Sequence, residues 1–413
     1  LYFGPLNSIL LIPLYILGGG PISDSWLVFA AACAFAVVLA LLFQTLEPLF
    51  CPAARKALRW GYAATALNVG MVACLKRPSF YEASIVTGSL CIVLAGWLAA
   101  QAFAWGNGAA GPMPAAAAGM GSGRWRLAGM GGLLLAASAS RIPLGLAGVL
   151  GVGFMALVQW QRRQGLPPQE RVRQLAWDAL CLAVPAGAVL LALGFYNFAR
   201  YGSFLETGYQ YQLAGLNVHQ AMQGHRLFTV DDLLYGAYAY LIKPFSFAQR
   251  APHLRLNADY APGSVYAQTG AEGTVGLIYV ATAIPLVLAA GLALWVGGWW
   301  RGSKSKERAE AGAKGTDFPG LRQALLWFLV LGLGGLAPLL VFSGLVARYY
   351  QDFLPALMVS ALCGYGLLQE RCVSRGHRIA SRVLRYAMMT ALVWGIFASL
   401  ETGWSYSLHW VLD

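Results

Sequence analysis

Long apolar segments constrain the fold of this chain more strongly than any other feature of its sequence. Only 11% of its 413 residues are charged, whereas soluble domains carry about a quarter. The apolar residues form continuous blocks, as expected of helices that cross a bilayer. We predict ten membrane-spanning helices, at residues 24–46, 60–75, 83–105, 127–140, 143–160, 175–195, 274–300, 324–343, 353–369 and 386–403. The sequence therefore predicts an all-α polytopic membrane protein.

The basic residues are distributed unevenly between the connecting loops, and this distribution predicts the orientation. Five alternate loops hold 20 of the 29 Lys and Arg residues, namely 47–59, 106–126, 161–174, 301–323 and 370–385. Since cytoplasmic loops are enriched in Lys and Arg, we place these five loops in the cytoplasm. The net charge of +12 follows from this topology, so we expect no nucleic-acid partner.

The apolar segment 5–19 is predicted to lie on the outer surface rather than to span the membrane. It contains Pro13, and a run of about 14 residues is more often interfacial or re-entrant than spanning. A span here would also move every later loop to the opposite side. The predicted order is the end of a first extracytoplasmic loop, six spans, a long extracytoplasmic loop, four spans and an extracytoplasmic tail, at residues 1–23, 24–195, 196–273, 274–403 and 404–413.

The long outer loop contains a predicted amphipathic helix. Thr229 followed by Asp232 is similar to a capping box at its start, and Pro244 ends it. One helical face carries Leu233, Leu234, Ala237, Tyr238 and Leu241. A helix with this pattern is predicted to lie on the membrane surface.

The motifs exclude several kinds of site. The seven cysteines lack the spacing of a zinc site. The chain has no Gly-rich phosphate loop of the Walker or Rossmann kind, no HExxH, and no GxSxG with a triad. The sequence therefore indicates no metal ion and no cofactor other than a lipid-linked substrate.

Four clusters of charged and aromatic residues interrupt the apolar sequence on the outer side, at residues 75–84, 138–143, 197–212 and 346–355. Ionisable groups near membrane depth are costly, so they usually pair or serve a site. Each cluster alone also fits a simpler interpretation, because Arg and Tyr at helix ends commonly anchor a protein at the interface. In that interpretation Arg348 and Asp352 form an i,i+4 pair, and Glu206 is a solvated loop residue. Because all four clusters share one face, we expect them to converge in one cavity.

The residue types in these clusters suit a ligand that carries both a phosphate and a sugar. Arginine binds phosphate through bidentate, charge-assisted hydrogen bonds. Tyrosines and an amide such as Gln210 suit sugar hydroxyls, and a carboxylate can act as the base for a hydroxyl nucleophile. Beside a bilayer, these groups favour a polyprenyl-phosphate sugar whose lipid tail stays in the membrane.

Four segments carry a resemblance to a known family: "YFGPLNSILLIPLYILGG", "RPSFYEASIVTG", "NFARYGSFLETGYQYQLAG" and "ARYYQDFLP". They resemble bacterial GT-C glycosyltransferases of the dolichyl-phosphate-mannose–protein mannosyltransferase superfamily, which are glycosyltransferase family 39-like. The resemblance implies a GT-C-like bundle of transmembrane helices, with juxtamembrane helices on the extracytoplasmic face. It also implies transfer of a hexose or pentose from an undecaprenyl- or decaprenyl-phosphate donor to a lipid, glycan or protein acceptor outside a bacterial cytoplasmic membrane. The site would face the periplasm or the cell exterior.

On the family's pattern, the donor phosphate would contact Arg348 first, with Arg200 and Arg141 next. The candidates for substrate binding, or for holding these arginines, are Glu206, Tyr209, Gln210, Tyr81, Glu82, Tyr349 and Asp352. Such enzymes usually carry a catalytic aspartate early in the first extracytoplasmic loop. This chain begins near the end of that loop, and its first carboxylate is Asp24. We therefore expect the catalytic acid upstream of Leu1 or absent, and we assign it to no residue.

Two other functions remain open at this point. A GT-C-like scaffold without catalysis, serving as a subunit of a larger membrane complex, fits the same features. A lipid or solute transporter ranks third, because transporters often show inverted repeats and mid-span ionisable residues. Here the charges lie at the ends of the predicted spans instead.

Overall fold

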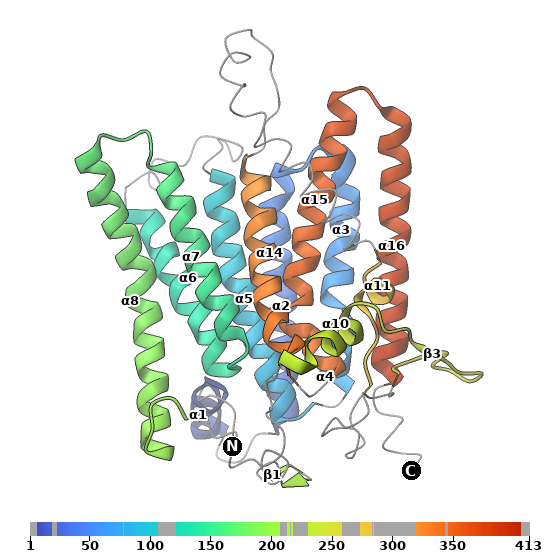
Figure 1. The fold of residues 1–413 in the computed structure, drawn as a ribbon, viewed down its shortest axis with the longest axis horizontal. Coiled ribbons are helices and arrows are strands. Elements are labelled where there is room, and N and C mark those ends of the chain that lie inside the picture. The colour runs from blue at the N-terminus through green and yellow to red at the C-terminus, as the bar shows by residue number, and fades with distance from the viewer. Residues whose placement is uncertain are drawn as a thin grey trace.

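The structure of the protein is a computed structural model, and the residues described are 6–18, 23–76, 78–105, 121–206, 213–214, 216–217, 230–257, 273–282, 284, 319–342 and 346–405. Its long helices run side by side in one bundle (Figure 1). They are α2 (Asp24–Leu46), α5 (Phe80–Trp105), α6 (Gly121–Ser140), α7 (Leu144–Arg162), α8 (Pro168–Tyr201), α14 (Pro319–Leu340), α15 (Leu354–Ser374) and α16 (Arg378–Ser405).

Shorter elements lie mostly at the lower end of the bundle in Figure 1, which we call the η6 end. The helices are α1 (Leu6–Gly18), α3 (Pro52–Ala66), α4 (Val69–Lys76), α10 (Leu233–Leu241) and α11 (Leu277–Val280). The 3-10 helices are η1 (Glu47–Leu49), η4 (Val230–Asp232) and η6 (Ala347–Asp352). Two antiparallel hairpins pair β1 (Leu213–Ala214) with β2 (Leu216–Asn217) and β3 (Ser246–Phe247) with β4 (Leu254–Arg255).

Six helices in the described part of the chain are long and apolar enough to cross a membrane, judged by length and composition. They include α5, whose apolar window is 83% buried, and α8, whose window is only 11% buried. Helix α5 therefore lies at the centre of the bundle, whereas α8 lies at its edge and packs against α6 and α7. The prediction of a polytopic helical membrane protein is confirmed at this level, while the total of ten spans stays a prediction.

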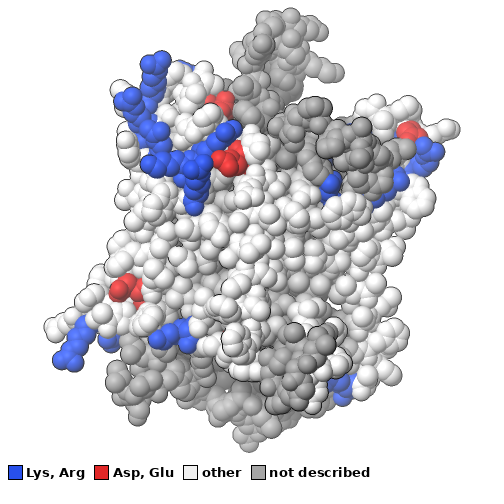
Figure 2. Space-filling view, turned by 180° about the vertical axis from the view of Figure 1, so that it is seen from behind, with Lys and Arg blue, Asp and Glu red and all other residues white. Residues whose placement is uncertain are grey.

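On the face drawn in Figure 2, charged side chains gather near the two ends of the molecule, and the described surface between them is an uncharged band. The basic turn between α15 and α16, with Arg375 and Arg378, lies opposite the η6 end. An uncharged band between two charged ends fits a bilayer core, where charged side chains are rare. The alternation of basic loops along the chain, and the topology drawn from it, stay a prediction.

The predicted span at residues 60–75 differs from the structure, which breaks this segment into two helices. Helix α3 ends at Ala66 and α4 begins at Val69. The side chain of Asn68 explains the break, because its Oδ1 accepts hydrogen bonds from the backbone N–H groups of Gly70 and Met71 at 3.0 and 3.2 Å. An asparagine that caps a new helix in this way competes with continuation of the old one.

Two further predicted segments, 5–19 and 274–300, lie only partly within the described residues. A helix forms at Leu6–Gly18, where a juxtamembrane helix is predicted, and Ile12, Tyr15 and Ile16 are exposed on it. Its placement on the membrane surface stays a prediction. Of the predicted span at 274–300, only the first residues lie in the described part, and helix α11 covers four of them.

Candidate functional site

Three of the four predicted clusters meet at the η6 end of the bundle. Helix α5 contributes its first turn, the junction between α6 and α7 contributes an arginine, and η6 contributes three side chains. We call this group the arginine–tyrosine cluster, and it consists of Tyr81, Glu82, Arg141, Arg348, Tyr349 and Asp352. The segments 75–84, 138–143 and 346–355 thus lie together in the structure, whereas the cavity they are expected to line stays a prediction.

Two buried ion pairs connect the elements of the cluster. Arg141 Nε lies 2.6 Å from Asp352 Oδ2, and Arg348 Nη1 lies 2.8 Å from Glu82 Oε1. The carboxylate side chains are 0% and 1% exposed, and those of Arg141 and Arg348 are 8% and 13% exposed. Each pair joins two separate elements, in place of an i,i+4 pair within η6. Charges buried to this degree are costly unless they are paired, so each arginine and its carboxylate hold each other in position.

The two tyrosines stack between the two arginines. The rings of Tyr81 and Tyr349 lie 6.2 Å apart with an interplanar angle of 24°, and their hydroxyl groups contact each other. The Arg348 guanidinium lies 4.3 Å from the Tyr81 ring centroid, and the Arg141 guanidinium lies 4.0 Å from that of Tyr349. Both distances are within the range of a cation–π interaction. The stacking fixes the guanidinium planes, which is the condition for directional binding of an oxyanion.

Burial raises the pKa of Asp352 to about 6, and the Arg141 guanidinium opposes this rise. The carboxylate of Asp352 depends on that guanidinium, because its other oxygen, Oδ1, accepts no hydrogen bond within the described part of the chain. An arginine in such a place stays charged under all ordinary conditions, whereas a carboxyl group can become neutral. Of the two members of this ion pair, only Asp352 can therefore lose its charge.

The 3-10 helix η6 is held in place by contacts around Gln351. Asn68 Nδ2 donates to Gln351 Oε1 at 2.8 Å, and the hydroxyl of Ser89 donates to the backbone oxygen of Gln351. Gly70 lets α4 approach, since a Cβ at this position would overlap the backbone nitrogen of Gln351. These buried polar contacts fix the backbone from which Arg348 and Asp352 project. Sequence reasoning missed Asn68 and Gln351, and their local sequence gives no signal of this pairing.

Replacing Gly70 is expected to disturb the site from a distance. Gly70→Ala should lower the free energy of unfolding by about 1–3 kcal/mol, because overpacking forces backbone shifts. Thermal or denaturant unfolding of the purified protein in detergent measures this change. The matched control is Gly187→Ala within α8, where an added Cβ meets open space and should leave stability unchanged or slightly raised. Equal behaviour of the two variants would contradict the close approach of α4 and η6.

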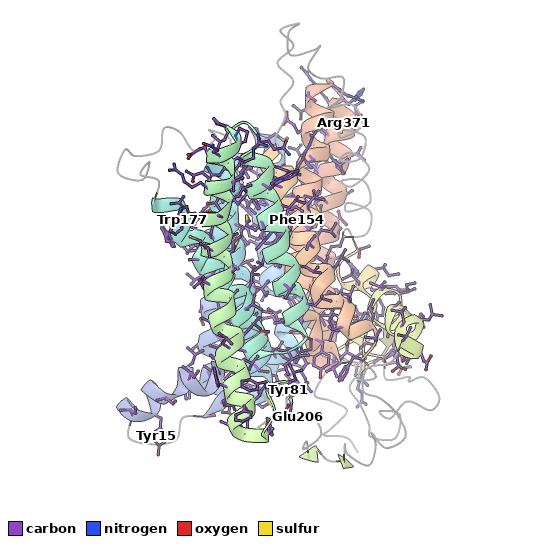
Figure 3. The ribbon with its side chains drawn as sticks, turned by 60° about the vertical axis from the view of Figure 1, so that its left-hand side comes forward. Tyr15, Tyr81, Phe154, Trp177, Glu206 and Arg371 are labelled. Atoms are coloured by element: carbon purple, nitrogen blue, oxygen red, sulfur yellow. The ribbon has the colours of Figure 1, made fainter. Side chains whose placement is uncertain are left out.

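The fourth predicted cluster lies at the same end of the molecule but on a different helix. Figure 3 shows Glu206 and Tyr81 near one end of the bundle, with Arg371 at the other end and Trp177 between the two. Arg200 stacks over Tyr196 and Tyr201 of its own helix α8 and donates to the Tyr196 hydroxyl at 2.7 Å. These contacts lie within α8 and involve no residue of the arginine–tyrosine cluster. Binding of phosphate by Arg200 stays a prediction.

The chain reverses direction after α8. Gly202 has a φ of 71°, a left-handed conformation that ends the helix and favours glycine. Phe204 then packs back on Phe195 and Phe198. Glu206 follows this turn and is partly exposed. Two further predicted residues, Tyr209 and Gln210, lie outside the described residues.

No group of three or more His, Cys, Asp and Glu side chains in the described ranges is arranged to hold a metal ion. Guanidinium groups and tyrosine hydroxyls donate hydrogen bonds, and the two carboxylates accept them. Such a set suits an anionic, hydroxyl-rich ligand.

Comparisons with known proteins give one structural similarity. No protein-family model matches the chain, and no curated protein matches it. Among solved structures, the chain is similar to the crystal structure of the oligosaccharyltransferase from Archaeoglobus fulgidus in its apo form, with 12% sequence identity and a TM-score of 0.47. The similarity covers 98% of this chain but only 48% of that chain. At this identity and TM-score, the similarity assigns no function to the chain.

Proposed function

We propose that this protein is a membrane glycosyltransferase that takes a sugar from a polyprenyl-phosphate donor and transfers it to an extracytoplasmic glycan, lipid or protein acceptor. The observation that carries the proposal is the pair of buried arginines stacked on Tyr81 and Tyr349 at one end of a membrane bundle. The resemblance of the segments around these residues to GT-C glycosyltransferases supports the same reaction. The proposed membrane is the cytoplasmic membrane of a bacterium, with the cluster facing outward.

The arginines are proposed to bind the donor phosphate. Arg348 is the first candidate, because its side chain is 13% exposed whereas that of Arg141 is 8% exposed. A phosphate oxygen at Arg348 would replace part of its contact with Glu82 and receive charge-assisted hydrogen bonds. Arg141, held by Asp352, would add positive potential from the other side of the tyrosine pair. The base that activates the acceptor is assigned to no described residue.

One observation favours a second candidate, a GT-C-like scaffold without catalysis. Each cluster arginine is already paired with a carboxylate, so the four charges balance within the protein. Balanced pairs between α5, the α6–α7 junction and η6 would serve equally well to hold these elements together. In that case the cluster would be needed for assembly of a membrane complex rather than for transfer.

Transfer of labelled sugar separates the two candidates. Membranes that contain the full protein should move radiolabelled hexose or pentose from a polyprenyl-phosphate donor into an acceptor fraction, and membranes lacking the protein should not. Purified protein should also bind undecaprenyl phosphate without any sugar. Failure of both experiments across a panel of sugars, together with purification as a stable stoichiometric complex, would replace the glycosyltransferase with the scaffold.

A further inference from the structure

Helix α10 exposes an apolar stripe that its packing inside the protein does not explain. Positions four residues apart on η4, α10 and the residue after it are all exposed and apolar. They are Val230, Leu234, Tyr238 and Ile242, with exposed fractions of 76%, 83%, 43% and 53%. This spacing places the four side chains on one face of a helix. An apolar stripe of this regularity marks an interaction surface rather than scattered surface residues.

The opposite face of α10 is also apolar, and it packs on the bundle. Gly236, Ala239 and Tyr240 are buried, and a Cβ at Gly236 would overlap the backbone oxygen of Leu340 in α14. A helix on the surface of a soluble domain turns a polar face outward. Helix α10 has apolar side chains on both faces, so its outer face requires an apolar partner.

The position of α10 in the molecule identifies that partner as lipid. Figure 1 shows α10 lying across the bundle, at a level that the lower ends of α8 and α16 both pass. Because α16 is long and apolar enough to span a membrane, a helix at the level of its last turns lies at the depth of the bilayer interface. This depth is where interfacial helices bury their apolar side chains.

The hairpin of β3 and β4 marks the same depth. His253 and Leu254 donate backbone hydrogen bonds to Glu401 of α16 at 2.6 and 3.4 Å. One turn later, Trp404 is 59% exposed, and Lys76 Nζ lies 3.9 Å from its ring centroid. Exposed tryptophan beside a cation is typical of the membrane–water interface. Phe247, which pairs with Leu254 across the hairpin and is 80% exposed, lies at this level too.

The inner face of α10 contacts the helix that carries the candidate site. The backbone N–H of Val346 donates to the Tyr240 hydroxyl at 3.4 Å. The Tyr350 hydroxyl donates to the backbone oxygen of Val275 and lies 3.3 Å from the backbone oxygen of Tyr240. The Tyr240 ring also lies 5.4 Å from that of Tyr350. Tyr350 lies in η6 between Arg348 and Asp352. Helix α10 thus lies on the outer surface of the bundle and also contacts η6, which carries Arg348 and Asp352.

We propose that the stripe of Val230, Leu234, Tyr238 and Ile242 is immersed in the lipid leaflet at the η6 end, and that this contact holds η6 in position through Tyr240. The partner is the acyl-chain region of ordinary phospholipid, bound without a specific headgroup. Lipid around α10 then controls how rigidly Arg348 and Asp352 are positioned, although it touches neither residue. The inference is independent of the ligand that the cluster binds.

Fluorescence quenching tests the lipid contact. Leu234→Cys, made in a chain whose accessible cysteines 33, 51, 181 and 372 are replaced by Ser, is labelled with bimane and placed in phosphatidylcholine nanodiscs. We expect quenching by lipids brominated near the headgroup end of their acyl chains, and little quenching by aqueous iodide. The matched control is Gln164→Cys in the exposed turn after α7, which should show the reverse. Quenching of the Leu234 label by iodide, or protection from both quenchers by covering protein, would overturn the proposal.

Hydrogen exchange tests the coupling to η6. In nanodiscs, Leu234→Glu should speed amide exchange in η6 by about tenfold, because loss of the lipid contact lowers the free energy of local opening. The matched control is Ile379→Glu, an equally exposed apolar position (79%) on α16 at the opposite end, which should leave η6 exchange unchanged. Unchanged exchange in Leu234→Glu would refute the coupling. The fluorescence experiment uses no charged variant, so it decides the lipid contact even if Leu234→Glu fails to fold.

Discussion

Arg348→Ala is expected to lower the affinity of the protein for polyprenyl phosphate by about 100-fold, which corresponds to about 2.7 kcal/mol. The side chain is largely buried and stacked on Tyr81, so a phosphate oxygen there receives hydrogen bonds that water does not replace. Removing one partner of a buried, charge-assisted hydrogen bond leaves the other unpaired. Binding of undecaprenyl phosphate to purified protein, measured by native mass spectrometry or thermophoresis, gives the affinity directly.

Two variants show whether this loss is specific to Arg348. Arg348→Lys keeps the charge but loses the planar fork of the guanidinium, so we expect an affinity between those of the wild type and Arg348→Ala. Arg375→Ala removes an exposed arginine at the opposite end of the bundle and should leave binding unchanged. The Arg348→Ala protein should remain folded, because Glu82 keeps the hydroxyl of Ser79 as a hydrogen-bond donor. Binding as tight as that of the wild type would remove Arg348 from the phosphate site.

Asp352→Leu is expected to lower the free energy of unfolding by about 3–5 kcal/mol, the usual cost of breaking a buried ion pair by removing one partner. Arg141, whose side chain is only 8% exposed, would keep its charge without a carboxylate, since arginine cannot lose its proton in a protein. Denaturant unfolding in detergent, followed by tryptophan fluorescence, measures the change.

Arg141→Met is expected to cost less than Asp352→Leu and to extend the pH dependence of stability to higher pH. Burial already raises the pKa of Asp352 to about 6, against the opposing effect of Arg141. Without Arg141 this pKa rises further, so the carboxyl group becomes neutral in the folded state near neutral pH. The pKa of Asp352 in the folded state then lies above its unfolded value of about 3.9. Between these two values the folded state binds more protons than the unfolded state, so a rise in pH lowers stability. Both proteins lose stability as the pH rises from about 4 to 6, but only Arg141→Met continues to lose it above the wild-type pKa of about 6. The stability of Arg141→Met should therefore fall relative to the wild type as the pH rises from about 6 to 8.

The double variant Arg141→Met with Asp352→Leu separates the two contributions. Replacing both charges with apolar side chains leaves no buried charge unpaired, so most of the stability lost in Asp352→Leu should return. If the double variant is as unstable as Asp352→Leu alone, the loss comes from packing around η6 rather than from the unpaired arginine. An Asp352→Leu protein as stable as the wild type would contradict the buried ion pair itself.

The sequence predicted much of the candidate site by residue type but little of its geometry. Arg348, Tyr349 and Asp352 lie within one short motif, and their charge in an apolar chain drew attention to them. The i,i+4 interpretation paired Arg348 with Asp352, whereas the structure pairs them with Glu82 and Arg141. These partners are 266 and 211 residues away in the chain. No local pattern encodes such a pairing, because it depends on how α5, the α6–α7 junction and η6 pack together.

The sequence by itself determined that the chain forms apolar helices with charged ends, because hydropathy and loop charge are local properties that insertion into a bilayer selects. It also identified the clusters at the η6 end as exceptions within apolar sequence. Only the tertiary structure decided which clusters meet, that α3 and α4 are separate helices, and that α10 is apolar on both faces. These features depend on contacts between distant segments, such as Asn68 with Gln351 and Tyr240 with Tyr350. Close approach at glycines such as Gly70 and Gly236 makes those contacts possible, and a single sequence does not state which backbone each glycine meets.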